Sequence, residues 1–239
     1  MKKISQVFFL AFIVFQKAAI AQKLSPEETV DQYCMDRTVD HVFFAPDDSE
    51  IYKSIIRGLI QMTEAQGKIR MAAFRLTDKD ICQDLIAAHA RGVSVEAVFD
   101  PGAVTTAFYS GVFLLCKAGI PVYQYIPVGL TPASSRSLLP GGRASYLSIM
   151  HQKTMIFENT CKGKNFVVFG SLNFTTAGFY GNEEAVQVRN KPELITAFLD
   201  HFELLKKRSY VVSLPKVVEQ STLRMPFVFL RMIQRFAKK

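Results

Sequence analysis

Three short stretches decide how this chain folds and what it can do: HQKTMIFE at 151–158, GSLNFT at 170–175 and NEE at 182–184. The apolar run in the first stretch predicts a β-strand, and residues two apart on a strand face the same way. His151 and Lys153 should therefore project side by side. An imidazole can be a nucleophile near neutral pH, and a neighbouring ammonium neutralises phosphate oxygens. The pair is suited to hold and attack a phosphate without a metal ion.

The second and third stretches supply further groups of the same kind. Gly170 permits close backbone approach at a turn, where the Ser171 hydroxyl and the Asn173 amide are neutral donors to oxyanions. Glu184 could accept the second N–H of a histidine and fix its orientation. Each element alone has a plainer explanation, as a surface pair, an ordinary turn or a solvated carboxylate. Their joint order and spacing argue against chance.

Strands and helices alternate along the rest of the chain. Strands are predicted at 41–46, 68–76, 93–99, 121–126, 147–157, 165–169 and 185–188. Helices are predicted at 26–37, 49–66, 78–91 with Thr77 as N-cap, about 107–118 and 192–208. This alternation is typical of an α/β layer with parallel pairing. We therefore predict an α/β fold with a mixed, largely parallel central sheet flanked by helices.

Residues 127–145 interrupt the alternation with prolines, glycines and serines. A loop of this length inside a compact domain is often a lid or a binding loop. Arg136 and Arg143 within it are candidate phosphate contacts, and the plainer alternative for either is a solvated loop charge.

The first 21 residues have the three parts of an export signal. Lys2 and Lys3 form a basic start, residues 7–15 are an unbroken apolar run of nine, and 19–21 (AIA) offers a cleavage site. Nine apolar residues are too few for a membrane span, which takes about 20. The alternative is an uncleaved anchor or a buried helix. We expect an exported protein, periplasmic or secreted.

The remaining chain is long enough for one domain that buries roughly 70% of its unfolded surface. We predict a signal peptide at 1–21, a lead-in at 22–40, a catalytic domain at 41–208 and a basic amphipathic extension at 209–239.

Charge favours a polyanionic partner. Without Lys2, Lys3 and Lys17, the 29 basic residues fall to 26, against 21 acidic residues. This modest excess is compatible with nucleic acid and with anionic lipid, and does not distinguish them.

The cysteines leave two interpretations open. Two disulfides are possible among Cys34, Cys82, Cys116 and Cys161, with three connectivities. Alternatively, Cys82 and Cys116 are small core residues on helix faces. No pair has C-x-x-C spacing and the histidines lie far apart, so the sequence indicates no metal site.

His151-x-Lys153 with an acid at Glu158, followed by Gly170-Ser171-x-Asn173, resembles the HKD motif of the phospholipase D superfamily. Further similarities lie at Val42-Phe43-Phe44-x-Pro46, Leu76-Thr77-Asp78, Ala90-Arg91-Gly92-Val93-x-Val95, Phe174-Thr175 and Asn182-x-Glu184. Together they resemble the small single-motif branch, which contains exported bacterial endonucleases and related mitochondrial enzymes. The resemblance spans about residues 40–205. The family usually has Asp where this chain has Glu158, so the acid is retained with one more methylene.

The resemblance implies a role for each reactive residue. His151 would be the nucleophile and would form a phosphohistidine intermediate with no metal or other cofactor. Lys153 and Asn173 would hold the non-bridging oxygens with support from Ser171, and Glu184 would orient His151.

Structural support for the motif is expected from Glu158 and Gly170. The family mechanism needs a second histidine for the leaving group, but this chain has one motif. The resemblance therefore implies half a site per chain and a homodimer in which His151 meets its mate across a two-fold axis. The alternatives within the chain are His41, His89 and His201, which lack a neighbouring lysine and donor turn.

The expected function is a metal-independent endonuclease that cleaves DNA or RNA. Single-stranded substrate would favour aromatic stacking. Candidate platforms are Phe108, Tyr109, Tyr123, Tyr125 and Tyr146, although most of them are expected to be core or sheet residues.

Two other functions are weighed against it. One is a phospholipase D-type lipid hydrolase or phosphatidyl transferase acting, for example, on cardiolipin. Its support is the basic amphipathic segment 222–239, which could lie on an anionic membrane or instead pack on the domain. The other is a catalytically silent binding module, which the complete motif argues against.

Overall fold

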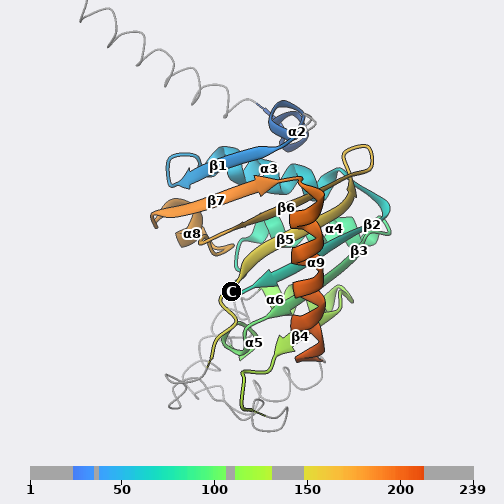
Figure 1. The fold of residues 1–239 in the computed structure, drawn as a ribbon, viewed down its shortest axis with the longest axis vertical. Coiled ribbons are helices and arrows are strands. Elements are labelled where there is room, and N and C mark those ends of the chain that lie inside the picture. Colours follow the sequence, from blue (N-terminus) through green and yellow to red (C-terminus); the bar gives the residue numbers. More distant parts are fainter. Residues whose placement is uncertain (1–23, 35–37, 106–110, 131–147, 213–239) are drawn as a thin grey trace, which may run out of the picture.

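One mixed sheet forms the centre of the computed structural model, which describes residues 24–34, 38–105, 111–130 and 148–212 (Figure 1). In these ranges the sheet has eight strands in the order β1-β7-β6-β5-β2-β3-β4-β8. The strands are β1 (Asp40–Ala45), β2 (Thr63–Ala73), β3 (Ser94–Phe99), β4 (Val122–Tyr125), β5 (Lys153–Thr160), β6 (Lys164–Gly170), β7 (Glu184–Arg189) and β8 (Ser209–Val211).

The pairing of the strands confirms the α/β class, but only a minority of the neighbouring strands are parallel. β2–β3 and β3–β4 are parallel, and the other five neighbouring pairs are antiparallel. The sheet is thus mixed, as predicted, but not largely parallel. Parallel neighbours need a crossover, which helices provide between β2, β3 and β4, whereas β5 returns into β6 through a short turn.

Helices cover both faces of the sheet. They are α2 (Pro26–Cys34), α3 (Ser49–Gln61), α4 (Lys79–Ala90), α5 (Pro101–Thr105), α6 (Gly111–Lys117), α8 (Thr176–Tyr180) and α9 (Pro192–Lys207). Figure 1 shows α9 crossing one face, with α3, α4 and α6 on the other. The larger hydrophobic core lies under α2, α3, α4, α6 and α8, and a smaller one lies under α9.

Alternation along β5 assigns its side chains to the two faces. Met155 and Phe157 belong to the larger core, and Ile156 belongs to the smaller core under α9. Because successive side chains on a strand point to opposite faces, Lys153 lies on the α3 side and Glu158 on the α9 side. The charged side chains at the two ends of β5 therefore lie on opposite faces of the sheet.

Three predicted boundaries differ from the observed ones. The helix predicted at 49–66 ends at Gln61, and β2 begins at Thr63 with a register irregularity before Lys68. Gln66 has a φ of 72°, so the polar segment that looked helical is a bulged strand start. The cap of α4 is Asp78, not Thr77, because its carboxylate accepts from the N–H groups of residues 80 and 81.

Further differences lie next to the motif and at the end of the domain. The strand predicted at 147–157 begins only at Lys153, so His151 precedes β5. At the other end of the domain, Ser209–Val211 forms β8 beside β4, although the sequence suggested that these residues begin the C-terminal extension. The signal segment 1–21, most of the loop at 127–145 and the tail at 222–239 lie outside the described residues.

All four cysteines are free thiols in this structure. Cys34, Cys82 and Cys161 are buried and Cys116 is half-buried. Burial raises the pKa of Cys82 to about 12 and that of Cys116 to about 11. They are thus packed as small apolar residues. None of the helices in the described ranges combines the length and hydropathy needed to cross a membrane.

Candidate active site

The predicted reactive residues meet at one edge of the sheet. Lys153, which begins β5, pairs with Ala73 at the end of β2, and Gly170 at the end of β6 pairs with Val186 of β7. The carboxyl ends of the parallel strands β2, β3 and β4 lie at this same edge, because β5 runs antiparallel to β2. In open α/β sheets ligands bind beyond this edge. The topology thus brings together segments that are up to about a hundred residues apart in sequence.

His151 is exposed and lies in extended chain just before β5. Its ring packs edge-to-face on Phe74, with 4.7 Å between ring centroids. The backbone beside it is held to β2, since Phe74 N–H donates to Gln152 O at 2.7 Å. Within the described part of the chain, no residue hydrogen-bonds to the imidazole nitrogens. The ring is therefore held in place and open to a substrate.

Lys153 brings a buried positive charge to the same place. The residue is only 3% exposed, and its Nζ donates to His151 O at 2.8 Å. Burial lowers the pKa of Lys153, and the nearby carboxylate of Glu184 opposes that effect. One of its three protons is used by the carbonyl, which leaves donors for phosphate oxygens.

The turn after β6 positions Ser171 against β7. Ser171 N–H donates to Ala185 O at 3.0 Å, and its hydroxyl oxygen accepts from Ala185 N–H at 3.1 Å. Gly170 is required here, since a Cβ would lie 2.3 Å from Ala185 O. The predicted structural role of Gly170 thus has a steric cause.

Asn173 has hydrogen-bonding capacity that no described residue uses. The residue is half-buried, and its Oδ1 is buried without a partner among the described residues. Its carbonyl is packed against Gly178, where a Cβ would lie 2.2 Å from Asn173 O. Thr175 follows as the N-cap of α8, with its hydroxyl accepting from Gly178 N–H at 3.0 Å. The backbone of Asn173 is thus fixed, while its amide remains available.

Phe174 ties this turn to the end of β2. The residue is fully buried and forms an isolated parallel bridge with Leu76. Its carbonyl accepts from Thr77 N–H at 2.9 Å and from Asp78 N–H at 3.1 Å. The Leu76-Thr77-Asp78 step and the second half of the motif therefore form one packed unit.

Glu184 begins β7 at the same edge. It pairs with Ala45, and its Oε1 accepts from the Asn182 side-chain amide at 3.2 Å. Its charge acts on Lys153. Among the described contacts no hydrogen bond joins Glu184 to His151, so its predicted role in orienting that ring stays a prediction.

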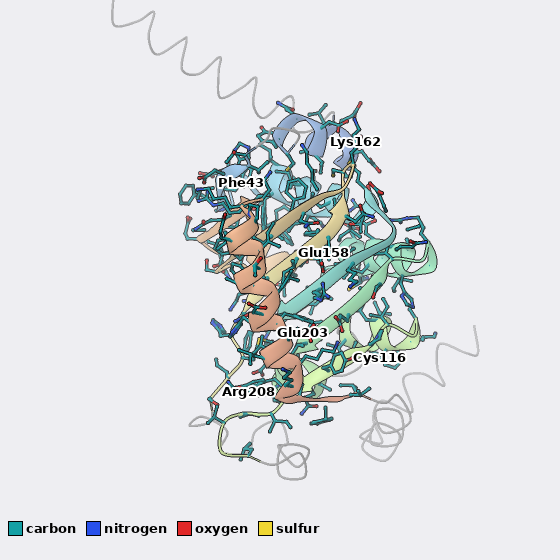
Figure 2. All side chains as sticks on the ribbon, turned by 45° about the vertical axis from the view of Figure 1, so that its right-hand side comes forward. Phe43, Cys116, Glu158, Lys162, Glu203 and Arg208 are labelled. Carbon is teal, nitrogen blue, oxygen red and sulfur yellow. The ribbon has the colours of Figure 1, made fainter. Side chains whose placement is uncertain are left out.

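Glu158 lies away from this edge. It is seven residues beyond His151, roughly 20 Å at strand geometry, on the α9 side of the sheet. There it forms an ion pair with Arg70 of β2. Arg70 also contacts Glu96 at 3.2 Å and Glu203 at 3.8 Å, and Lys206 contacts Glu96 at 2.5 Å. Figure 2 shows Glu158 on the sheet and Glu203 on α9, the two elements that this cluster joins.

Sequence reasoning missed three residues at the site. Phe74 packs on His151, and the Arg75 guanidinium lies 5.4 Å from the centroid of the Phe74 ring. Asp100 directly follows β3 and is 4% exposed. Its Oδ2 accepts from Met150 N–H at 3.0 Å. The missed signal was their position, since Phe74 and Arg75 are the first two residues after β2 and Asp100 is the first after β3.

Burial raises the pKa of Asp100. Hydrogen bonds from the N–H groups of Gly102 and Met150 and the nearby Arg75 and His151 oppose the effect of burial. A carboxylate is thus buried next to the exposed imidazole and the exposed guanidinium.

The other histidines lie elsewhere. The His41 ring contacts Tyr33 O at 2.8 Å. His89 is in the last turn of α4, before β3, and Asp100 follows the far end of that six-residue strand, roughly 20 Å away. His201 is exposed on α9, on the opposite face from Lys153. None of the three takes the place of a second histidine beside His151.

The other candidate contacts have mixed outcomes. Arg136, Arg143, Phe108, Tyr109 and Tyr146 lie outside the described residues. Tyr125 is buried in the core under α9, as expected for a sheet residue, and Tyr123 packs on Lys206. Among the described residues, no group of three or more His, Cys, Asp or Glu side chains is placed to hold a metal ion.

Comparisons with known proteins find a matching family model and structures of similar fold. A family model described as "Cardiolipin synthase, PLD-like domain" matches residues 59–206, more than half of the chain. No curated protein matches the sequence significantly. Nuc from Salmonella typhimurium, a phospholipase D family member, is 26% identical with a TM-score of 0.54, covering 74% of this chain and 100% of that chain.

Two further structures share the fold. NucT from Helicobacter pylori is 17% identical with a TM-score of 0.61, covering 74% of this chain and 100% of that chain. The phosphatidylserine synthase of Haemophilus influenzae Rd KW20 is 11% identical with a TM-score of 0.50, covering 85% of this chain and 46% of that chain. The family match over residues 59–206, together with the motif at the sheet edge, shows that the chain belongs to the phospholipase D superfamily.

Proposed function

We propose that this protein is an exported, metal-independent endonuclease that cleaves nucleic acid through a phosphohistidine on His151. The observation that carries the proposal is the exposed imidazole of His151 beside the buried ammonium of Lys153. The Asn173 side chain, whose Oδ1 has no partner among the described residues, and the turn at Ser171 lie at the same sheet edge. The superfamily chemistry is phosphodiester cleavage, and these are the groups that it needs.

The reaction has two displacements. A neutral imidazole nitrogen of His151 attacks phosphorus, the P–O bond to the leaving nucleotide breaks, and that oxygen takes a proton from a second histidine. Water then attacks phosphorus and gives its proton to the second histidine, and the P–N bond breaks to restore His151. Lys153 and the Asn173 amide bind the non-bridging oxygens on which charge develops.

Lowering of the Lys153 pKa by burial suits this role. A desolvated ammonium interacts strongly with an incoming phosphate because little water screens it. Arg75, exposed beside Phe74 at this edge, is placed to contact a neighbouring phosphate of a polymeric substrate.

The second histidine is proposed to come from a second copy of the chain. His41, His89 and His201 are placed away from His151, so one chain lacks the general acid that the reaction needs. Light scattering on the active protein should give twice the mass of a single chain. An active monomer would refute the shared site.

A lipid substrate is the second candidate. The matching family model carries the description of a cardiolipin synthase, and one structure of the same fold is a phosphatidylserine synthase. The basic segment 222–239, outside the described residues, would support membrane contact. We favour nucleic acid because the sequence resembles the small single-motif branch with its exported endonucleases.

The deciding experiment is a parallel assay of the purified protein on single-stranded DNA, duplex DNA, RNA and cardiolipin in EDTA. Wild type should cleave at least one nucleic acid, and His151→Ala should cleave none. Turnover of cardiolipin alone would replace the nuclease assignment with the lipid one. Cleavage by His151→Ala would show that another group is the nucleophile.

A further inference from the structure

The position of His151 depends on bonds made by its neighbours, because it lies outside β5. On one side, Gln152 O accepts from Phe74 N–H at 2.7 Å. On the other side, Met150 N–H donates to Asp100 Oδ2 at 3.0 Å. The nucleophile is thus held between a backbone bond to β2 and a side-chain bond to the end of β3.

Asp100 is itself firmly placed. It is 4% exposed, and its second oxygen, Oδ1, accepts from Gly102 N–H at 2.8 Å at the start of α5. Met150 is 3% exposed and packs in the core under α9. One buried carboxylate therefore joins β3, α5 and the residue before His151.

We propose that Asp100 is a positioning residue, which fixes the imidazole of His151 by holding Met150, and that phosphodiester cleavage at this site depends on it. The inference rests on the proposed function, since it takes His151 as the nucleophile. Asp100 does not contact the substrate in this account. Its effect passes through the backbone of Met150 to the orientation of the ring on Phe74.

The chemistry of the carboxylate supports this role. Two N–H donors, from Met150 and Gly102, face two acceptor oxygens. An asparagine has one acceptor and one NH₂ group, so whichever way its amide turns, one of these bonds is lost. Asp100→Asn therefore preserves size while breaking the pair of bonds through which residue 100 links Met150 to the start of α5.

A displaced nucleophile is costly even when the fold is intact. A misplacement of about 1 Å can lower a reaction rate about 100-fold. We expect Asp100→Asn to lower the rate of chemistry 10- to 100-fold. The rate constant should be measured in single turnover, with saturating enzyme over an end-labelled single-stranded DNA. Under these conditions it does not depend on the fraction of misfolded enzyme.

Asp84→Asn is the matched control. Asp84 also accepts two hydrogen bonds, from Arg57 Nε at 2.6 Å and Gln61 Nε2 at 3.1 Å, but it joins α3 to α4 away from the site. This variant should keep the wild-type rate constant. A rate constant for Asp100→Asn within twofold of wild type, or an equal fall in Asp84→Asn, would overturn the proposal.

Ring resonances of the histidines provide a readout independent of activity. Asp100→Asn should shift the His151 resonances and leave those of His41, His89 and His201 unchanged. If wild type cleaves no phosphodiester, the proposed function fails, and this spectrum still decides the positioning role. Unchanged His151 resonances would contradict it in either case.

Discussion

β5 has a charged side chain near each end, buried at Lys153 and half-buried at Glu158, and the two have different surroundings. Lys153 is 3% exposed, lies on the α3 side, and hydrogen-bonds to a carbonyl, with Glu184 as the nearby opposite charge. Five residues on, Glu158 lies on the α9 side and pairs with Arg70 in a cluster that includes Glu96 and Glu203. The Lys153 ammonium has no ion pair within the described residues, whereas the Glu158 carboxylate is paired with Arg70.

The difference separates function from stability. Burial lowers the pKa of Lys153, which means that its charged ammonium destabilises the folded chain. A phosphate bound to the ammonium would offset this destabilisation. The Arg70 cluster instead joins β2, β3, β5 and α9 through ion pairs. The acid of the motif, Glu158, therefore belongs to the scaffold in this chain, while the buried acid near His151 is Asp100.

The largest expected effect is at the reactive end. His151→Ala should lower turnover by at least about 10³-fold, because the nucleophile is removed. The melting temperature should stay close to that of wild type, since His151 is exposed. Steady-state assays and thermal unfolding measure the two quantities. Turnover of His151→Ala near the wild-type rate would show that His151 is not the nucleophile.

Lys153→Met should lower turnover by about 10²- to 10³-fold, the usual cost of losing one preorganised donor to developing charge. Its stability should be equal to or higher than that of wild type. The lowered pKa means that the protonated form is less favourable in the folded chain than in the unfolded chain, so its burial opposes folding at neutral pH. A variant that is both active and unstable would reverse this assignment.

Glu158→Gln tests the scaffold end. Removing one partner of a partly buried ion pair should cost about 1–2 kcal/mol of stability, because Arg70 keeps Glu96 and Glu203 nearby. Turnover should remain within a few-fold of wild type at a temperature where the variant is folded. Denaturant unfolding gives the first quantity. A 100-fold loss of turnover in a fully folded variant would return Glu158 to the active site.

The smallest effect is a pH dependence of stability. Burial raises the pKa of Asp100 above its ordinary 3.8, so the folded chain holds this proton to a higher pH than the unfolded chain. Its contribution to stability is present below pH 3.8 and declines as pH rises through the raised pKa. The melting temperature of Asp100→Asn minus that of wild type should therefore increase as the pH rises from 3.8 to neutrality. If this difference in melting temperature does not change with pH, Asp100 does not carry a buried charge in the folded chain.

The motif residues could be predicted from the sequence because they are recognised by their spacing over a few neighbouring positions. His151 and Lys153 are two apart, and Ser171 and Asn173 share one turn that Gly170 makes possible. Asp100 could not be found in this way. It acts on Met150, fifty residues away, and only the parallel arrangement of β2 and β3 brings it to the motif.

The same limit explains the errors in the fold. The segment 62–66 continues a helical pattern, but Thr63 bonds to Thr160 across the sheet, with 2.6 Å between their hydroxyl oxygens. That contact involves a strand almost a hundred residues later. Similarly, β8 is too short to give a signal of its own, and is defined by its pairing with β4.

In the proposed reaction His151 forms a covalent bond to phosphorus without a metal ion. The direct measurement is to incubate wild type with labelled substrate in EDTA, quench in alkali, digest with trypsin and map the label by mass spectrometry. The tryptic peptide 144–153 contains His151 as its only histidine. We expect label on this peptide in the wild type and none in His151→Ala. Activity abolished by EDTA, or label on another peptide, would contradict it.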